Sequence, residues 1–107
     1  IMNEDVQNFF DWEGESNFMK YSVKFKDKIF APISHIDNTS RIQTVTSEQW
    51  YYNELLCEFE KLTGLPMLLN TSLNDNGKPI AGKPEDALEL LKNSDIDKIV
   101  IGDDTYK

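Results

Sequence analysis

Cysteine, histidine and arginine each occur only once in this chain of 107 residues, as Cys57, His35 and Arg41. A single cysteine excludes an internal disulfide, and the lone histidine has no cysteine pattern around it that would indicate a metal site. Cys57 falls at an apolar position of a helical pattern, so we expect an inert core side chain. No run of about 18 apolar residues is present, and we expect no membrane-spanning helix.

Positive charge is also scarce. The 11 basic and 19 acidic residues give a formal net charge of -8, and lysine supplies every basic residue except Arg41. A field of this sign repels polyanions, which argues against general binding to DNA or RNA. The acidic residues at 1–5 precede no apolar segment and predict no secretory signal. We therefore expect a single cytoplasmic domain without a membrane or nucleic-acid partner.

Periodicity predicts alternating helices and strands, typical of an α/β or α+β fold with a twisted mixed sheet and packed helices. The apolar face of the longest helix comprises Tyr52, Leu55, Leu56, Phe59 and Leu62. That helix begins at a Thr46–Gln49 capping box and ends at Gly64 and Pro66. The other expected elements are a helix over 3–10, a strand over 18–25, a strand, turn and strand over 30–45, a buried strand over 65–69, a helix from Pro84 and a strand over 99–101.

Segment 34–45 contains both His35 and Arg41. A planar guanidinium is well suited to bidentate binding of phosphate or carboxylate, so Arg41 is a candidate anion ligand. The alternative is an ordinary surface ion pair with an acidic side chain. His35 could be a packing histidine, a pH-sensitive switch or a site residue, and Asp37 could form an Asx turn with Thr39.

The polar loop over 70–77 follows the expected strand over 65–69. Its Thr71, Ser72 and Asn74 side chains can donate hydrogen bonds, and its backbone amides can converge on an anion. Ligands of α/β sheets bind beyond the carboxyl ends of strands, where this loop would lie. The same residue types are ordinary turn formers, and that structural alternative explains them without a ligand.

Four segments together resemble the C-terminal domain of the carbamoyltransferase family that includes nodulation and antibiotic-tailoring enzymes. SHIDNTSRIQTV (34–45) is similar to the family's T-H-V-D-G-T-A-R-x-Q-T-V, and LPMLLNTSLNDNGKPI (65–80) to V-P-x-L-L-N-T-S-F-N-x-x-G-E-P-I. KPEDALELL and DKIVIGDDT resemble the family's T-P-E-D-A stretch and its closing strand and turn. Asn38, Leu73 and Lys78 depart from the usual glycine, phenylalanine and glutamate.

The resemblance implies a fold related to the YrdC-like threonylcarbamoyl-adenylate synthases. It also implies an enzyme that forms carbamoyl adenylate from carbamoyl phosphate and ATP, with Mg²⁺ possible, for transfer to a hydroxyl acceptor. Residues 1–107 would be the C-terminal part of this domain, without its upstream portion and without the iron-holding N-terminal transfer domain. That N-terminal domain would be its partner within the full-length protein.

The resemblance also assigns roles to residues. Arg41 would be the catalytic residue and bind the carbamoyl or phosphate group, while His35 and Asp37 would shape the pocket. The loop residues that would contact the adenylate are Asn70, Thr71, Ser72 and Asn74. Further basic residues would lie upstream, so we expect the isolated chain to bind substrates weakly and to be inactive alone.

Two other functional hypotheses stay open at the level of sequence. One is a non-catalytic module that keeps the fold and binds a nucleotide or a protein. The other is a synthase relative that acts on RNA, which the acidic charge of the chain does not favour.

Overall fold

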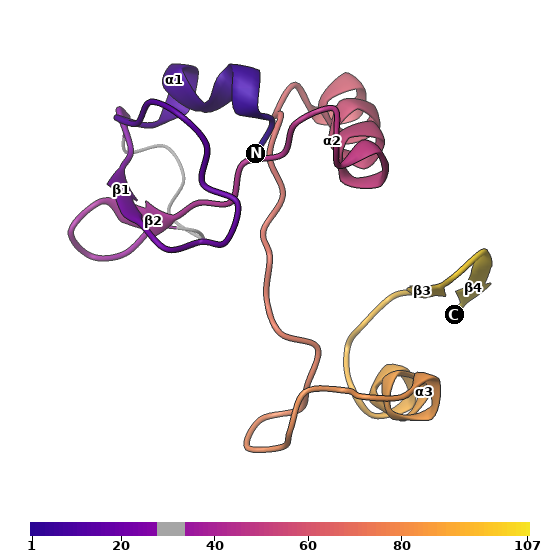
Figure 1. The fold of residues 1–107 in the computed structure, drawn as a ribbon. Coiled ribbons are helices and arrows are strands. Elements are labelled where there is room, and N and C mark those ends of the chain that lie inside the picture. Colours follow the sequence, from indigo (N-terminus) through magenta and orange to yellow (C-terminus); the bar gives the residue numbers. More distant parts are fainter. Residues whose placement is uncertain (28–33) are drawn as a thin grey trace. The chain divides into compact units, whose positions relative to one another are not determined.

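The computed structural model of the chain describes residues 1–27 and 34–107, which form two compact units, Ile1–Leu69 and Asn70–Lys107. Both helices and strands are present, and this confirms the predicted α+β class. The first unit contains a 3-10 turn (Asn3–Asp5), α1 (Val6–Phe9), β1 (Ser22–Lys24), β2 (Thr39–Arg41) and α2 (Trp50–Thr63). The second contains α3 (Pro84–Asn93), β3 (Ile99–Ile101) and β4 (Asp104–Tyr106) (Figure 1).

Each sheet in the described residues is a two-stranded antiparallel pair, β1 with β2 and β3 with β4. The sequence favoured one mixed sheet instead. Only Gly102 and Asp103 join β3 to β4, and so short a connection allows only antiparallel pairing, because parallel strands need a crossover of a dozen or more residues. β4 was not expected from the sequence, and the YrdC-like relationship stays a prediction.

The register of β1 and β2 separates an inner face from an outer face. Val23 lies opposite Ser40. Phe25 lies two residues after Val23, and Ile42 lies two residues after Ser40. Side chains two residues apart in a strand share a face, and Val23, Phe25 and Ile42 are indeed all buried. The core that they form also contains Val6, Phe10 and Met67.

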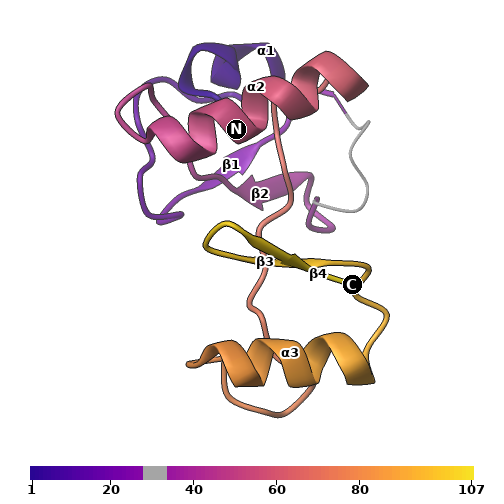
Figure 2. The same ribbon diagram turned by 90° about the vertical axis from the view of Figure 1, so that its right-hand side faces the viewer.

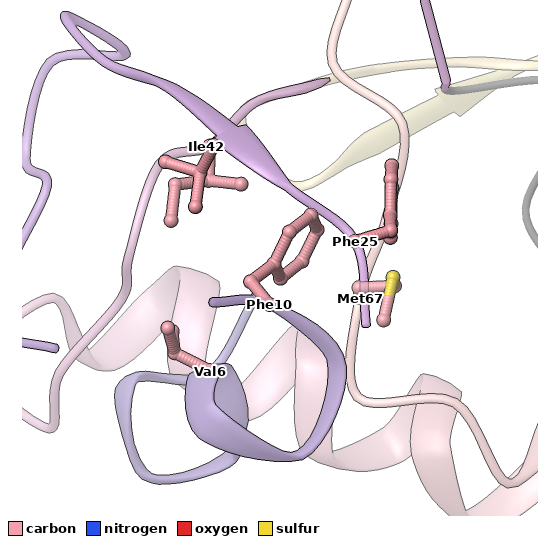
Figure 3. Close-up of a cluster of buried hydrophobic side chains, with 6 residues drawn as sticks. Val6, Phe10, Phe25, Ile42 and Met67 are labelled. Carbon is pink, nitrogen blue, oxygen red and sulfur yellow. The ribbon is translucent and has the colours of Figure 1, made fainter. Parts of the chain in front are cut away.

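Phe10 lies at the centre of this core (Figure 3). Its ring centroid is 4.3 Å from that of Phe25, and a backbone bridge joins the same two residues. Val6, on α1, is 2% exposed, which confirms the predicted apolar role of the opening helix. Both views place α1 and α2 on the same side of the β1–β2 pair (Figure 2).

The segment after β2 is held by buried polar groups. The Ser16 amide donates to Thr44 Oγ1 at 2.8 Å, and the Ser16 hydroxyl donates to the Ile42 carbonyl at 2.8 Å. The Asn3 amide donates to the Val45 carbonyl at 2.9 Å, which ties the start of the chain to this segment. The hydrogen bonds of Ser16 and Thr44 avoid the cost of burying these polar groups unpaired.

Helix α2 forms as predicted, but fewer of its apolar side chains are buried than predicted. Gln49 Oε1 accepts from the Thr46 amide at 2.7 Å, as in a capping box, although the helix begins only at Trp50. Gly64 ends it in the left-handed region at φ 75°. Leu56 is buried against Met2 and Val45, with half-buried Cys57 beside them. Of the predicted apolar face, Leu56 is buried and Phe59 is half-buried, but Tyr52, Leu55 and Leu62 are exposed, as are Trp50 and Tyr51.

Two strand expectations in the first unit also need correction. The strand over 18–25 is limited to Ser22–Lys24, because Met19 has a φ of 50° that breaks an extended conformation. No strand forms over 65–69 in the described chain: Met67 is buried, but Leu69 is exposed. Pro66 lacks an amide donor, which disfavours pairing there. The first strand expected within 30–45 falls partly on residues 28–33, outside the described residues.

The second unit follows the sequence closely. Pro84 begins α3, and the Asp86 carboxylate accepts from the amides of Gly82 and Lys83 at 3.0 and 3.1 Å, which satisfies donors at the helix start. Ala87 on α3 and Ile99 on β3 are buried. None of the helices formed by residues 1–27 and 34–107 has the length and apolar content that crossing a membrane requires.

We expect Phe10→Ala to lower the free energy of unfolding of the first unit by about 3–5 kcal/mol, because it leaves a cavity beside Phe25. Urea unfolding measures this loss. Ile42→Val, in the same core, should lower the free energy of unfolding by only about 0.5–1.5 kcal/mol. This variant should stay folded and have a stability between those of the native chain and Phe10→Ala. Phe18→Ala is the control, since Phe18 is 77% exposed. Equal effects of Phe10→Ala and Phe18→Ala would contradict the assigned core.

Candidate functional site

The outer face of the β1–β2 pair is polar and carries two cations. Arg41 lies opposite Ser22, and Lys24 lies opposite Thr39. Directly opposed residues of an antiparallel pair project to the same face, so these four side chains share the face that the core residue Val23 does not occupy. The two cationic side chains on this face, Arg41 and Lys24, make it a candidate anion site. We refer to these four residues as the outer face.

Arg41 is exposed and has no ion-pair partner within residues 1–27 and 34–107. The alternative of a surface ion pair therefore has no support in the described residues. A guanidinium without a carboxylate partner keeps its donors available for an anion.

Thr39 connects the outer face to the preceding turn. Its amide and its hydroxyl both donate to Asp37 Oδ1, at 3.1 and 2.7 Å. Its Oγ1 also lies 3.2 Å from His35 Nδ1 and 3.0 Å from Ser22 Oγ. The amide contact is the Asx turn considered from the sequence, which the structure confirms. Thr39 is only 8% exposed, so this hydroxyl is a buried junction of three side chains.

The turn before Thr39 is closed by backbone bonds. The His35 amide donates to the Thr39 carbonyl at 2.7 Å, and the Asn38 amide donates to the His35 carbonyl at 3.0 Å. Asn38 has a φ of 61°, a conformation that asparagine tolerates and that the family's glycine also allows. His35 is exposed, so the alternative of a buried packing histidine is wrong.

The Thr39 hydroxyl lowers the pKa of Asp37 below its usual value of 3.8, because a donated hydrogen bond favours the ionised carboxylate. The Thr39 amide and the nearby His35 act in the same direction, while desolvation opposes them. Asp37 is therefore ionised at neutral pH, and its charge is directed at the Thr39 donors.

The loop over 70–77 belongs to the second unit, and its hydrogen bonds are largely internal. The Ser72 hydroxyl donates to Asn74 Oδ1, and Asn74 Nδ2 donates to the carbonyls of Asp75 and Lys78 at 3.0 and 3.2 Å. Gly77 takes the positive φ of 77° expected for the end of this turn. These contacts give Ser72 and Asn74 a role in bracing the turn. Their role in binding, together with that of Asn70 and Thr71, stays a prediction.

A shallow hollow of about 230 Å³ adjoins this loop within the second unit. Asn74 and Lys78 line it from the loop, and Asp86 and Glu89 line it from α3. Carboxylates outnumber the single lysine among these four, so the hollow is a poor site for an isolated anion. Among the residues that the structure describes, no His, Cys, Asp and Glu side chains gather in a group that could hold a metal ion.

Comparison with known proteins identifies the family. A family model described as the carbamoyltransferase C-terminus matches residues 1–107. The chain belongs to the carbamoyltransferase C-terminus family. The match covers both compact units, and therefore both the outer face and the loop over 70–77 are parts of this family domain.

Relatives of this carbamoyltransferase C-terminal chain are much longer than it is. The nodulation protein NolNO of Sinorhizobium fredii is 35% identical over 95% of the chain and 16% of its own length. NolO of Bradyrhizobium diazoefficiens is 34% identical over 94% of the chain and 20% of its own length. The 3'-hydroxymethylcephem-O-carbamoyltransferase of Amycolatopsis lactamdurans is 29% identical over 97% and 20%. The chain thus spans at most a fifth of the length of these proteins.

Sequence reasoning missed three members of the site: Ser22, Lys24 and Thr39. A signal for Ser22 and Lys24 exists, since they alternate with Tyr21 and Val23 in a strand pattern. The pattern places them on a polar face but does not show that Arg41 lies across from them. Thr39 was considered only as the end of an Asx turn, whereas its buried hydroxyl joins Ser22, His35 and Asp37.

We expect Asp37 to titrate below 3.8, the usual value of its pKa, in the folded chain. A carboxyl whose pKa is lower in the folded than in the unfolded state stabilises the fold above the unfolded value, and this stabilisation is lost as pH falls through the folded pKa. Carboxyl ¹³C NMR measures the titration. Thr39→Val should move the midpoint back towards 3.8, and an unchanged midpoint in that variant would assign the shift to another cause.

Proposed function

We propose that this chain is the C-terminal domain of an ATP-dependent O-carbamoyltransferase and that its outer face contacts the phosphate of a carbamoyl phosphate-derived ligand. The proposal is based on the register of β1 and β2, in which Arg41 lies opposite Ser22 and Lys24 lies opposite Thr39. This register brings two cations to one face of a strand pair in a chain whose net charge is -8.

The chemistry of this surface suits a phosphate. A phosphate group offers only acceptor oxygens, and Arg41 and Lys24 supply cationic donors. Arg41 is the proposed catalytic residue, because a guanidinium aimed at a transferring group stabilises the charge that develops on it. Lys24 adds a second, point-like cation beside the planar guanidinium.

The proposed reaction also involves ATP and a hydroxyl acceptor, in addition to the phosphate at the outer face. Carbamoyl adenylate is the proposed product of ATP and carbamoyl phosphate, and a hydroxyl compound is the acceptor. The acceptor named for the Amycolatopsis lactamdurans relative, a hydroxymethylcephem, is one example of that class. The loop residues proposed to contact adenylate are Asn70, Thr71, Ser72 and Asn74, of which Thr71 has an exposed side chain. Mg²⁺ would bind through ATP phosphates.

The relatives are much longer than the chain, and this affects the activity that we expect of the chain alone. Because the chain spans at most a fifth of each of them, we propose that the remaining parts of the enzyme site lie in the rest of the full-length protein. The chain alone should then bind carbamoyl phosphate weakly and transfer no carbamoyl group.

We expect Arg41→Ala to weaken binding of carbamoyl phosphate about 10- to 100-fold, the range for losing a hydrogen bond to a charged group. Lys24→Ala should weaken it less, because Lys24 supplies a single point charge. NMR titration at millimolar ligand detects such weak binding. Arg41→Lys separates charge from geometry and should restore binding only in part.

Lys61→Ala is the matched control. It removes the same charge from exposed α2, where Lys61 pairs with Glu58 at 2.6 Å, and should change affinity less than twofold. If Lys61→Ala and Lys24→Ala weaken the binding of carbamoyl phosphate equally, the effect of Lys24 comes only from the net charge of the chain. Unchanged binding in Arg41→Ala would overturn the proposed role of the outer face.

A further inference from the structure

The contacts of Thr39 decide where the ring proton of neutral His35 lies. A hydroxyl has one proton to donate and two lone pairs to accept with. Asp37 Oδ1 lies 2.7 Å from Thr39 Oγ1, and an ionised carboxylate can only accept, so the Thr39 proton must point at Asp37. The remaining contacts of Thr39 Oγ1, with Ser22 Oγ at 3.0 Å and His35 Nδ1 at 3.2 Å, then require both neighbours to donate.

These hydrogen-bond directions leave the second ring nitrogen of His35, Nε2, as an acceptor. If Nδ1 carries the proton, Nε2 of the neutral imidazole carries a lone pair. Nε2 lies on the opposite side of the ring from the Nδ1 contact, and His35 is exposed. The Asp37–Thr39–His35 chain thus leaves a hydrogen-bond acceptor on a residue that contacts Thr39 of the outer face, where Arg41 and Lys24 are the available donors.

We propose that Thr39 positions His35 in its Nδ1–H form so that Nε2 accepts a hydrogen bond from the NH₂ group of a carbamoyl ligand. The proposal rests on the proposed function of the outer face and adds a selectivity element to it. A carbamoyl phosphate has two chemically different ends: the phosphate only accepts hydrogen bonds, and the amide NH₂ donates them. Arg41 and Lys24 suit the first end, and His35 Nε2 suits the second.

The spacing along β2 is compatible with one small ligand. Thr39 and Arg41 are two positions apart on the same face, which corresponds to about 7 Å along a strand. His35 contacts Thr39 directly. For one carbamoyl phosphate to reach both residues, the long and exposed Arg41 side chain has to extend along β2 towards His35.

The ring tautomer is tested by long-range ¹H–¹⁵N NMR of the chain at a pH where His35 is neutral. Because His35 is the only histidine, its ring signals need no assignment by mutation. We expect the Nδ1–H form to dominate in the native chain, to lose its dominance in the isosteric Thr39→Val and to regain it in Thr39→Ser. A native chain in the Nε2–H form would overturn the positioning role of Thr39.

The ligand contact is tested with two compounds of similar shape, carbamoyl phosphate and acetyl phosphate, in which a methyl replaces the NH₂ group. The native chain should bind carbamoyl phosphate about two- to tenfold more tightly, the range for one hydrogen bond. His35→Ala should abolish this preference while retaining acetyl phosphate affinity. Arg41→Ala should weaken binding of both compounds.

The outcomes separate the two proposals. If both compounds bind through Arg41 with equal affinity, or if His35→Ala weakens both equally, the carbamoyl contact of His35 is wrong while the proposed function stands. If neither compound binds at millimolar concentration, the proposed function of the outer face fails and the ligand contact fails with it.

Discussion

The register between β1 and β2 is the constraint on which the first unit depends. It places Val23, Phe25 and Ile42 in the core and leaves Ser22, Lys24, Thr39 and Arg41 on the opposite face. A slip of one residue would exchange the faces, exposing the apolar set and burying two cations. Core packing therefore stabilises the same register that assembles the candidate site, so fold and site are specified together.

The surroundings of Arg41 combine an unfavourable overall charge with a favourable local one. Acidic residues exceed basic ones in the whole chain, which disfavours anions at long range. At short range, charge-assisted hydrogen bonds dominate, and the outer face supplies cationic donors without a carboxylate paired to Arg41 in the described residues. Asp37 does not change this, because its charge faces the Thr39 donors. Such a surface favours a small anion over a polyanion.

Local signals predicted the ends of elements well and their packing less well. Gly64 and Pro84 mark a helix end and a helix start through backbone properties that need no distant partner. Leu55 and Leu62 have helical spacing, yet both are exposed, because burial depends on which surfaces the unit supplies. Residues 65–69 failed as a strand for a related reason: an apolar run does not specify a pairing partner, and Pro66 cannot donate a ladder hydrogen bond.

The sequence alone identified Arg41 as the single guanidinium, the Asp37–Thr39 turn as local chemistry, and the family through the motifs around both. These depend on residues that are neighbours in the chain. Only the tertiary structure brought Ser22 and Lys24 across from Arg41 and Thr39, because cross-strand neighbours are set by register rather than by spacing. It also decided the ring proton of His35, since that proton follows from contacts that β1 and the turn make with one buried hydroxyl on β2.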